Sequence, residues 1–426
     1  MKKLLFVVID GAADTPVSAL GGKTPLEIAK KPNINNLSRM GTNGLMQVLP
    51  IPPESDEAVL SLLGYDVFDV YTGRGPLEAV GGGADFQDGD IAIRCNFGSM
   101  ENGVIKNVRM DDFSSEDAKK LEWAINEFVK LTNAEFVFRS TAKYRGVLVI
   151  KSKEKLSPKI TNTHPGYIVR PMTSIYGEVP VSSAVANPDM VMRKVIPMER
   201  TKEAAFTAEV VNEFIKKSAE VLKNHPLNIE RKAQKKAPAN IIITRDAGDR
   251  LPKLFSFSKT YDVHWACFAE MPVEKGIAQL SGMELIPMPE ASGDVRKDYW
   301  IWAQTLIKNI QLYDAVYVHL KGPDIFAHMG DYQGKIQSIE NIDKYFFEPV
   351  LKRIDLQNTI IVVTCDHTTS CESKSHTDAP VPLTIAGPDI FPDNVSGFSE
   401  RSCANGAMKS IRAMDLMPML MKFVKR

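Results

Sequence analysis

The sequence lacks paired cysteines, a net charge and long apolar runs, and each absence excludes a class of protein. Its five cysteines are scattered with no CxxC pair, which argues against a disulfide framework and predicts a reducing, cytoplasmic location. Lys and Arg number 52, as do Asp and Glu, so a nucleic-acid-binding protein that depends on bulk positive charge is not expected. No apolar stretch approaches the roughly 18 residues of a membrane span, and the run after Lys2 and Lys3 meets Asp10 too soon for a signal peptide.

Continuous apolar runs separated by helical stretches indicate the fold class. The first run, Lys3–Ile9, is typical of a strand buried on both faces of a parallel sheet. Similar runs recur late in the chain, and helical stretches such as Val295–Ile310 and Gln337–Lys352 separate most of them. We therefore predict an α/β domain with a mostly parallel sheet flanked by helices. The later runs are Asn240–Thr244, His264–Ala269, Glu284–Met288, Ala315–Leu320, Thr359–Cys365 and Pro382–Ala386.

The middle of the chain has a different pattern. Residues 71–239 hold shorter strands, which predicts an inserted, smaller α+β domain. The segment Pro171–Met192 has little periodicity and is rich in Pro, Ser and Gly, so we expect a loop there. A connecting amphipathic helix is predicted over Thr201–Leu222. The main domain is then formed by residues 1–70 and 240–426.

Carboxylates follow three of the predicted strands. Asp10 comes directly after the first strand, Asp324 follows the strand that ends at Leu320, and Asp366 follows the one that ends at Cys365. Ligands of open α/β sheets bind beyond the carboxyl ends of the strands. Three strands would therefore deliver a carboxylate to the same edge of one sheet.

Three of the seven histidines fall close to these carboxylates. Asp324 and His328 are four residues apart and share one face of a helical turn that a proline opens. Asp366 and His367 are adjacent, and His376 follows in a polar loop. Carboxylates and imidazoles suit Mn²⁺, Zn²⁺, Co²⁺ or Mg²⁺ rather than a thiolate site. Six ligands are too many for one catalytic metal with an open position, so two metals poised for phosphoryl transfer fit better.

Ser55 is a candidate nucleophile. It lies where a loop meets a predicted helix, and we expect it at the N-cap position. The N-terminus of a helix presents free N–H groups and partial positive charge, which favour a phosphate. A nearby metal would lower the pKa of the hydroxyl and activate it without a neighbouring histidine. The alternative is that Ser55 is only a helix cap.

Several segments together resemble a known family. They are FVVIDGAAD, PLEIAKKPNINNLSRMG, the Ser55 loop with LSLLGYD, YTGRGPLEAVG, AIRCNF, the KGPD segment with His328, and TCDHTTSCESKSHTDAPVPL. Over essentially its whole length the chain resembles the archaeal type of 2,3-bisphosphoglycerate-independent phosphoglycerate mutase, in the alkaline phosphatase superfamily. The resemblance implies a cytoplasmic isomerase of glycolysis and gluconeogenesis. It would interconvert 3-phosphoglycerate and 2-phosphoglycerate with two metal ions and no bisphosphoglycerate.

The resemblance also implies roles for individual residues. Ser55 would take the phosphoryl group of 3-phosphoglycerate, and the bound glycerate would reorient before the group returns to its 2-hydroxyl. One metal would be held by Asp10, Ser55, Asp366 and His367, and the other by Asp324, His328 and His376. The anionic substrate would be bound by Arg74, Arg94, Arg109, Arg145, Arg245 and Lys275.

The chain departs from the family pattern in the predicted insertion. The segment Asn107–Asp112 keeps Arg109 but lacks the other arginines of the family segment, and Thr163-His164-Pro165 replaces an Asp-Pro-His turn. These departures leave two alternatives: another metal-dependent phosphomutase or phosphomonoesterase of the superfamily, or a weakly active metabolite-binding paralogue. No partner beyond a small phosphorylated substrate is predicted. The sequence indicates neither an oligomeric state nor which metal is used.

We predict that activity depends on metal. Six O and N ligands have no purpose in a core unless they hold cations, because unpaired buried carboxylates are costly. EDTA should abolish mutase activity, and Mn²⁺ or Co²⁺ should restore it in an assay without bisphosphoglycerate. Full activity after exhaustive chelation, with no metal found by elemental analysis, would contradict the two-metal interpretation.

Overall fold

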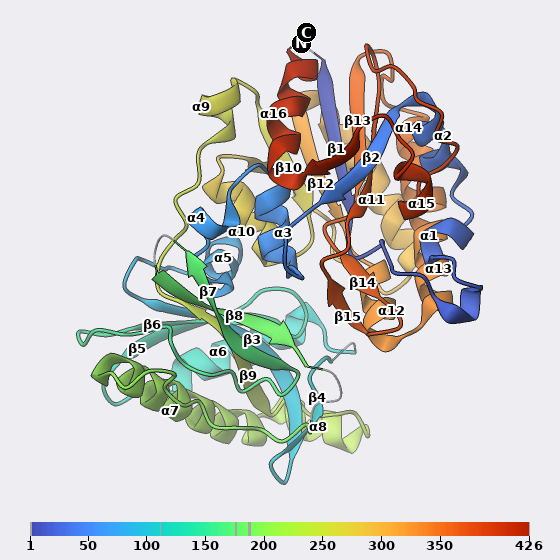
Figure 1. Cartoon of the computed structure of the whole chain (residues 1–426). Helices are drawn as coiled ribbons and strands as arrows, with labels where there is room; N and C mark the ends of the chain where they lie inside the picture. The colour runs from blue at the N-terminus through green and yellow to red at the C-terminus, as the bar shows by residue number, and fades with distance from the viewer. Residues whose placement is uncertain (1, 111, 175–176, 186–188, 426) are drawn as a thin grey trace. The chain divides into compact units, whose positions relative to one another are not determined.

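The chain divides into two compact units. The computed structural model describes residues 2–110, 112–174, 177–185 and 189–425. One unit comprises Met1–Val67, Leu254–Glu270 and Ala278–Arg426. The other comprises Phe68–Lys253 and Met271–Ile277. We call them the first and the second unit (Figure 1).

An eight-stranded sheet forms the centre of the first unit. Its strand order is β11-β10-β12-β1-β13-β16-β2-β17. Only β16 runs against its neighbours, because it pairs antiparallel with both β13 and β2, while the other pairs are parallel. The predicted α/β class with a mostly parallel sheet is therefore confirmed. The strands are β1 (Lys3–Ile9), β2 (Thr42–Gln47), β10 (Trp265–Ala269), β11 (Glu284–Leu285), β12 (Ala315–Leu320), β13 (Thr359–Thr364), β16 (Val381–Ala386) and β17 (Lys409–Arg412).

Helices flank this sheet, and every residue of β12 and β13 is buried. A short hairpin of β14 (Thr368–Ser370) and β15 (Ser375–Thr377) follows β13. It lies beside α12 in Figure 1. The helices are α1 (Pro25–Ile28), α2 (Pro32–Met40), α3 (Ser55–Leu62), α9 (Phe257–Tyr261), α11 (Val295–Asn309), α12 (Pro323–Met329), α13 (Tyr332–Ile342), α14 (Glu348–Leu351), α15 (Glu400–Cys403) and α16 (Ala413–Val424). Short helical turns occur at Ser18–Leu20, Ile310–Leu312 and, as a π-helix, Asp343–Phe347.

The second unit contains an antiparallel sheet of order β4-β3-β6-β5. A fifth strand, β9, also pairs with β3, along the same stretch of β3 that pairs with β6. The rings of Phe97, Phe138 and Phe214 pack against one another in its core. Its strands are β3 (Ile91–Glu101), β4 (Val104–Asn107), β5 (Glu135–Ser140), β6 (Arg145–Lys151), β7 (Tyr167–Ser174), β8 (Gly177–Ala184) and β9 (Ile241–Gly248). Its helices are α4 (Val67–Val70), α5 (Arg74–Gly81), α6 (Ser115–Phe128), α7 (Lys202–Asn224) and α8 (Pro226–Ala233), and α10 (Pro272–Leu280) begins in this unit.

Two segment predictions were wrong. The run Asn240–Thr244 was assigned to the main sheet, but β9 pairs antiparallel with β3 in the second unit. A continuous apolar run has the same pattern in any sheet that buries both of its faces. The segment Pro171–Met192 was expected to be a loop, but β7 and β8 form a hairpin in which Pro171 lies opposite Pro180. A two-stranded ribbon tolerates proline because each strand has an unpaired edge. Residues 175–176 and 186–188 of this segment lie outside the described residues.

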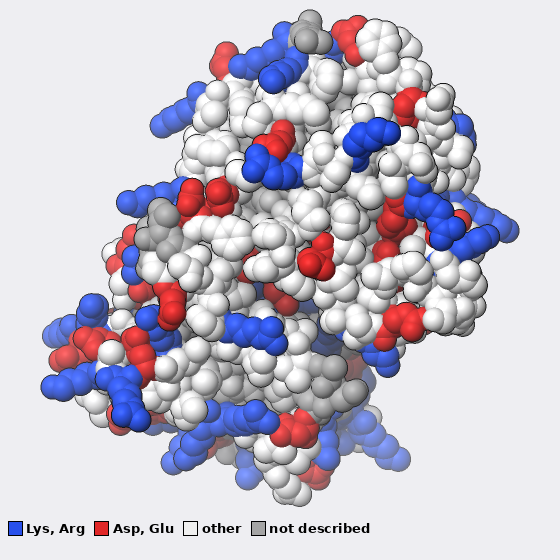
Figure 2. All heavy atoms as spheres, viewed as in Figure 1, with Lys and Arg blue, Asp and Glu red and all other residues white. Residues whose placement is uncertain are grey.

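Charged side chains of both signs are interspersed on the face that Figure 2 shows, as expected for a chain without net charge. In the described part of the chain, no helix combines the length and the hydropathy that crossing a bilayer requires.

A buried lysine on α13 connects this helix to the loop after β1 and to the β14 hairpin. Lys335 is fully buried, and its Nζ donates hydrogen bonds to the carbonyls of Ala13 and Thr369, at 2.9 and 2.7 Å. It also donates to Oδ2 of the buried Asp14, at 2.8 Å. Asp14 in turn accepts from the backbone N–H of Cys371. One ammonium group therefore fixes the loop after β1 against the β14 hairpin.

We expect Lys335→Met to destabilise the protein by about 3–5 kcal/mol, because Asp14 would stay buried without its cation. Chemical denaturation of the metal-free protein measures the change. Lys352→Met is the matched control, since Lys352 makes an exposed ion pair with Glu348 and should change stability by less than about 0.5 kcal/mol. Equal effects of the two substitutions would show that the buried ammonium has no special role.

Candidate active site

Asp10, Asp366 and His367 form one group of potential metal ligands. Asp10 directly follows β1, and Asp366 and His367 lie between β13 and β14. One donor atom of each lies within 4.8 Å of the others. His367 Nε2 is 3.4 Å from Asp10 Oδ1 and 3.3 Å from Asp366 Oδ2. The sequence reasoning that placed these residues at one sheet edge thus agrees with the geometry.

The donor atoms of this group fit a bound cation. All three residues are buried. Asp10 Oδ1, Asp366 Oδ2 and His367 Nε2 have no hydrogen-bond partner among the described residues. Buried polar atoms without partners are unfavourable unless something else satisfies them. Two carboxylate oxygens and an imidazole nitrogen are ligands that divalent metals accept.

The two carboxylates of this group titrate in opposite directions. Burial opposes ionisation of Asp10, but the charge of Lys321, whose Nζ lies 3.1 Å from Asp10 Oδ2, together with the hydrogen bond and charge of His367 lowers the pKa of that carboxyl. For Asp366, burial and then the negative charge of Asp10 raise the pKa well above its ordinary value. The positive charge near the two buried carboxylates is therefore too small to keep both of them ionised. A bound cation would supply the missing charge.

Asp324, His328 and His376 form the second group. The expected helical turn is confirmed, because Pro323 opens α12, which carries Asp324 and His328; His376 lies on β15. The Nε2 atoms of the two histidines lie 3.1 Å apart, and each is 3.4 Å from Asp324 Oδ1. Although burial favours the neutral carboxyl, hydrogen bonds from both imidazoles hold the pKa of Asp324 well below its ordinary value.

Backbone carbonyls determine the tautomer of both histidines in this second group. His328 Nδ1 lies 3.0 Å from the carbonyl of Lys374, and His376 Nδ1 lies 2.7 Å from that of Pro53. A carbonyl can only accept, so each Nδ1 carries a proton. An imidazole that donates to Asp324 through Nε2 is doubly protonated, and once the ring is neutral its remaining proton is on Nδ1 and Nε2 is left to bind a metal. The imidazoles of His376 and His367 stack with centroids 3.8 Å apart, so the two groups are neighbours.

Ser55 lies at the start of α3, but not at the predicted position. The N-cap is Glu54, which forms a reciprocal capping box with Glu57, and Ser55 is the first helical residue. The N-cap prediction was wrong because a glutamate can accept the same backbone hydrogen bond as serine. The half-buried Ser55 side chain is thereby released from capping. The hydrogen bond from His376 to Pro53 places this loop beside the second group.

His319 is a buried residue of the site that sequence reasoning missed. It lies on β12, with Nε2 3.5 Å from Asp366 Oδ2 and Nδ1 2.8 Å from the Tyr317 hydroxyl. His319 therefore lies next to Asp366, a potential metal ligand. The available signal was a histidine within an otherwise apolar strand, one residue before its end.

The second unit brings three of the predicted substrate-binding arginines together. Arg94 on β3 is in register with Arg245 on β9. Glu78 Oε1 lies 2.9 Å from Arg74 Nε and 3.6 Å from Arg94 Nε. Arg245 lies 3.7 Å above the ring of Tyr167. Burial, followed by repulsion from Arg245 and Arg74, lowers the pKa of Arg94 to about 9. This arginine cluster is a place where an anion would be favourable.

His164, in the altered Thr163–Pro165 turn, belongs to the same cluster. Burial and the charges of Arg245 and Arg94 lower its pKa to about 3, so its imidazole is neutral. The turn thus keeps a histidine beside the arginines although the order of residues differs from the family pattern.

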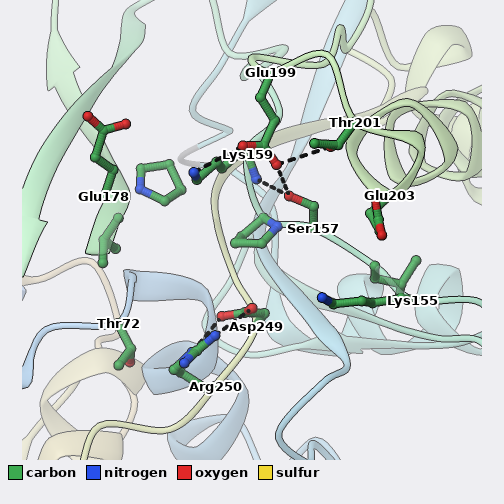
Figure 3. Close-up of a pocket in the computed structure, with 14 residues that line it drawn as sticks. Thr72, Lys155, Ser157, Lys159, Glu178, Glu199, Thr201, Glu203, Asp249 and Arg250 are labelled. Carbon is green, nitrogen blue, oxygen red and sulfur yellow. Dashed lines mark hydrogen bonds and ion pairs between the residues drawn. The ribbon is translucent and has the colours of Figure 1, made fainter. Parts of the chain in front are cut away.

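The remaining predicted cations are more dispersed. Arg109 is exposed, Arg145 lies against the ring of Tyr144, and Lys275 is half-buried on α10. The second unit also contains a cavity of about 310 Å³, shown in Figure 3. Four of its charged side chains form two ion pairs, Lys159 with Glu199 and Arg250 with Asp249. None of the predicted substrate-binding cations is among its lining residues that the structure describes.

Comparisons with known proteins identify the family. The family model described as 2,3-bisphosphoglycerate-independent phosphoglycerate mutase matches residues 38–228. A mutase of that name from Methanosphaera stadtmanae is 37% identical over 421 residues, which cover 98% of this chain and 96% of the relative. The chain belongs to the 2,3-bisphosphoglycerate-independent phosphoglycerate mutases. The resemblance in the sequence is therefore confirmed.

Other proteins match the chain over the same span. A relative of the same name from Thermococcus kodakarensis is 34% identical over 432 residues, covering 100% of this chain and 98% of its own. The solved cofactor-independent phosphoglycerate mutase from Thermoplasma acidophilum has a TM-score of 0.58 and 29% identity, covering 100% of both chains. A Pyrococcus horikoshii protein has a TM-score of 0.75 and 28% identity, covering 100% and 97%. The chain is thus an isomerase of small phosphorylated substrates that requires metal but no bisphosphoglycerate.

For this mutase we expect Asp366→Asn to stabilise the metal-free protein at neutral pH. Folding raises the pKa of Asp366 above its ordinary 3.8, so the folded chain holds a proton that the unfolded chain releases. Its carboxyl therefore favours folding only at low pH, and stability falls as the pH rises toward the folded-state pKa. The gain from asparagine should shrink on acidification, as chemical denaturation between pH 4 and 7 would measure.

Asp393→Asn is the control of opposite sign. Burial opposes ionisation of Asp393, but hydrogen bonds from Ala407 N and Asn43 lower its pKa. This variant should lose stability at neutral pH, with the loss shrinking as pH falls. If both variants shift stability in the same direction, the assigned titration of Asp366 is wrong.

Proposed function

We propose that the chain interconverts 3-phosphoglycerate and 2-phosphoglycerate through a phosphoserine on Ser55, at a site that holds two divalent metal ions. The observation that carries the proposal is the pair of adjacent ligand groups, each with three donor atoms within 4.8 Å, beside the start of α3. In this proposal, Asp10, Asp366, His367 and Ser55 hold one metal ion. Asp324, His328 and His376 hold the other metal ion.

The reaction begins and ends at one hydroxyl. Ser55 Oγ attacks the phosphorus of 3-phosphoglycerate, the bond from phosphorus to the 3-oxygen breaks, and that oxygen takes up a proton. The glycerate stays bound and turns, and its 2-oxygen attacks the phosphoserine, which restores the Ser55 hydroxyl. When bound, the divalent cations stabilise negative charge on the phosphoryl oxygens and lower the pKa of the serine hydroxyl. Mn²⁺, Co²⁺, Zn²⁺ and Mg²⁺ are all compatible with the oxygen and nitrogen ligands.

The two units have different tasks in this proposal. The first unit holds the metals and the nucleophile. The arginine cluster of the second unit binds the anionic groups of the substrate, because Arg74, Arg94 and Arg245 carry more positive charge than Glu78 and Asp246 neutralise. A bound phosphate or carboxylate would supply partners for Nε and Nη1 of Arg94, which are buried and make no hydrogen bond among the described residues.

A second candidate is a phosphomonoesterase with the same metal site. The feature that favours it is the altered segment Asn107–Asp112, in which Arg109 is exposed and Asp111 lies outside the described residues. The ratio of 2-phosphoglycerate formed to inorganic phosphate released separates the two candidates. All five cysteines are buried and form no disulfide, which supports our assignment of the reaction to the cytoplasm.

We expect Ser55→Ala to lower phosphoryl transfer on the order of 10⁴–10⁶-fold, as deletion of a nucleophile does. Metal binding should weaken only modestly, since three ligands of that metal remain. Mutase activity is followed by a coupled assay without bisphosphoglycerate, and wild-type protein quenched during turnover is searched for phosphate on Ser55 by mass spectrometry.

Ser61→Ala is the matched control from the same helix. Ser61 is buried and donates to the carbonyl of Val48 at 2.8 Å, so its role is structural and turnover should stay close to wild type. Near-normal turnover of Ser55→Ala would rule out the phosphoserine mechanism and make a water molecule the next candidate nucleophile.

A further inference from the structure

Thr369 lies between the two ligand groups. It is fully buried on β14, two residues after His367, and is paired with His376 across the hairpin. Its backbone N–H donates to the carbonyl of Ala13 at 3.0 Å, and its own carbonyl accepts from Lys335 at 2.7 Å. The backbone on both sides of the side chain is therefore fixed.

The Thr369 hydroxyl contacts one ligand from each group. Oγ1 donates to Asp324 Oδ1 at 2.8 Å and lies 2.9 Å from His367 Nδ1. A hydroxyl has one proton, and an ionised carboxylate can only accept it. Toward His367 the oxygen must therefore act as acceptor, which requires the proton of the imidazole to be on Nδ1. Nε2 is then unprotonated and faces Asp10 and Asp366.

This arrangement distinguishes His367 from the other two histidines. His328 and His376 donate to backbone carbonyls. A carbonyl is always an acceptor, so these two tautomers do not depend on neighbouring side chains. A hydroxyl can reverse its direction. The ligating tautomer of His367 thus depends on Thr369, and the direction of the Thr369 hydroxyl depends on Asp324, a ligand of the other group.

We propose that Thr369 is a positioning residue that couples the two metal sites. The inference rests on the two-metal site of the proposed function. A cation held by the Asp324 group would fix the position of that carboxylate, which orients the Thr369 hydroxyl and leaves His367 Nε2 free to bind the second cation. Occupation of one group therefore favours occupation of the other.

Gly11 gives independent evidence that the space around this bridge is closed. A Cβ at Gly11 would lie 2.7 Å from both Asp324 Oδ1 and Thr369 Oγ1, and the residue has a φ of +56°. The backbone thus passes directly over the hydrogen bond, at a distance that only glycine allows. Little room remains for a water molecule to replace the hydroxyl if it were removed.

The test is Zn²⁺ binding by the full chain, compared among the wild type, Thr369→Val and Thr369→Ser. Calorimetric titration and elemental analysis give the number, affinity and cooperativity of bound Zn²⁺. Valine keeps the shape and removes the hydroxyl, and should weaken Zn²⁺ binding about 10- to 100-fold with loss of cooperativity. Serine keeps the hydroxyl and should restore both. Thr368→Val is the matched control, because the Thr368 hydroxyl donates only to the carbonyl of Ala379 among the described residues.

A second measurement needs no variant. Nitrogen-15 chemical shifts of histidine-labelled, Zn²⁺-loaded wild-type protein report which ring nitrogen carries the proton, and His367 should be protonated at Nδ1. Protonation at Nε2 overturns the inference, even if Thr369→Val does not fold. Two Zn²⁺ ions bound to Thr369→Val with wild-type affinity and cooperativity overturn it while leaving the proposed function intact. A wild-type protein that binds no Zn²⁺, Mn²⁺ or Co²⁺ overturns both.

Discussion

The buried ammonium of Lys335 is the constraint on which the active-site geometry depends. Of the candidate ligands, Asp10 follows β1, whereas Asp366 and His367 follow β13 more than 300 residues later in the sequence. Loops normally tolerate displacement, but here Lys335 joins them through the carbonyls of Ala13 and Thr369. Because each of its three acceptors is an oxygen in a buried setting, no aliphatic side chain could replace it. The positions of the candidate metal ligands thus depend on a residue that contacts none of them.

The ligand groups themselves are electrostatically unbalanced without metal. Lys321 lies 3.1 Å from Asp10, and among the described residues Asp10 Oδ1 and Asp366 Oδ2 have no hydrogen-bond partner. A protein core normally excludes such an arrangement. Asp10 and Asp366 nevertheless lie together because each follows a buried strand, β1 or β13, and these two strands are paired. The arrangement that the proposed function requires is therefore unfavourable for the stability of the metal-free protein.

Much of this could be predicted from the sequence, for identifiable reasons. Apolar runs such as Ala315–Leu320 became strands, and Asp10, Asp324 and Asp366 met at one edge because strand ends determine where the following residues lie. What failed depended on tertiary partners. The run Asn240–Thr244 contains nothing that reveals which sheet it joins, and His319 looks like any strand residue until Asp366 is placed beside it. Glu54 took the cap expected of Ser55 because Glu57 could reciprocate.

The position of β1 has a consequence for how the protein is made. It is the first strand in the sequence, yet Leu4 pairs with Ala315 on one side and Ile360 on the other. The sheet of the second unit, by contrast, finds all its partners between Ile91 and Gly248. During synthesis the sheet of that unit can form before β12 and β13, the partner strands of the almost wholly apolar β1, have been made. Strand pairs between residues far apart in sequence form slowly, and until they form, the exposed apolar strands are prone to aggregation. We therefore expect the candidate site at the end of β1 to be among the last parts of the nascent chain to form.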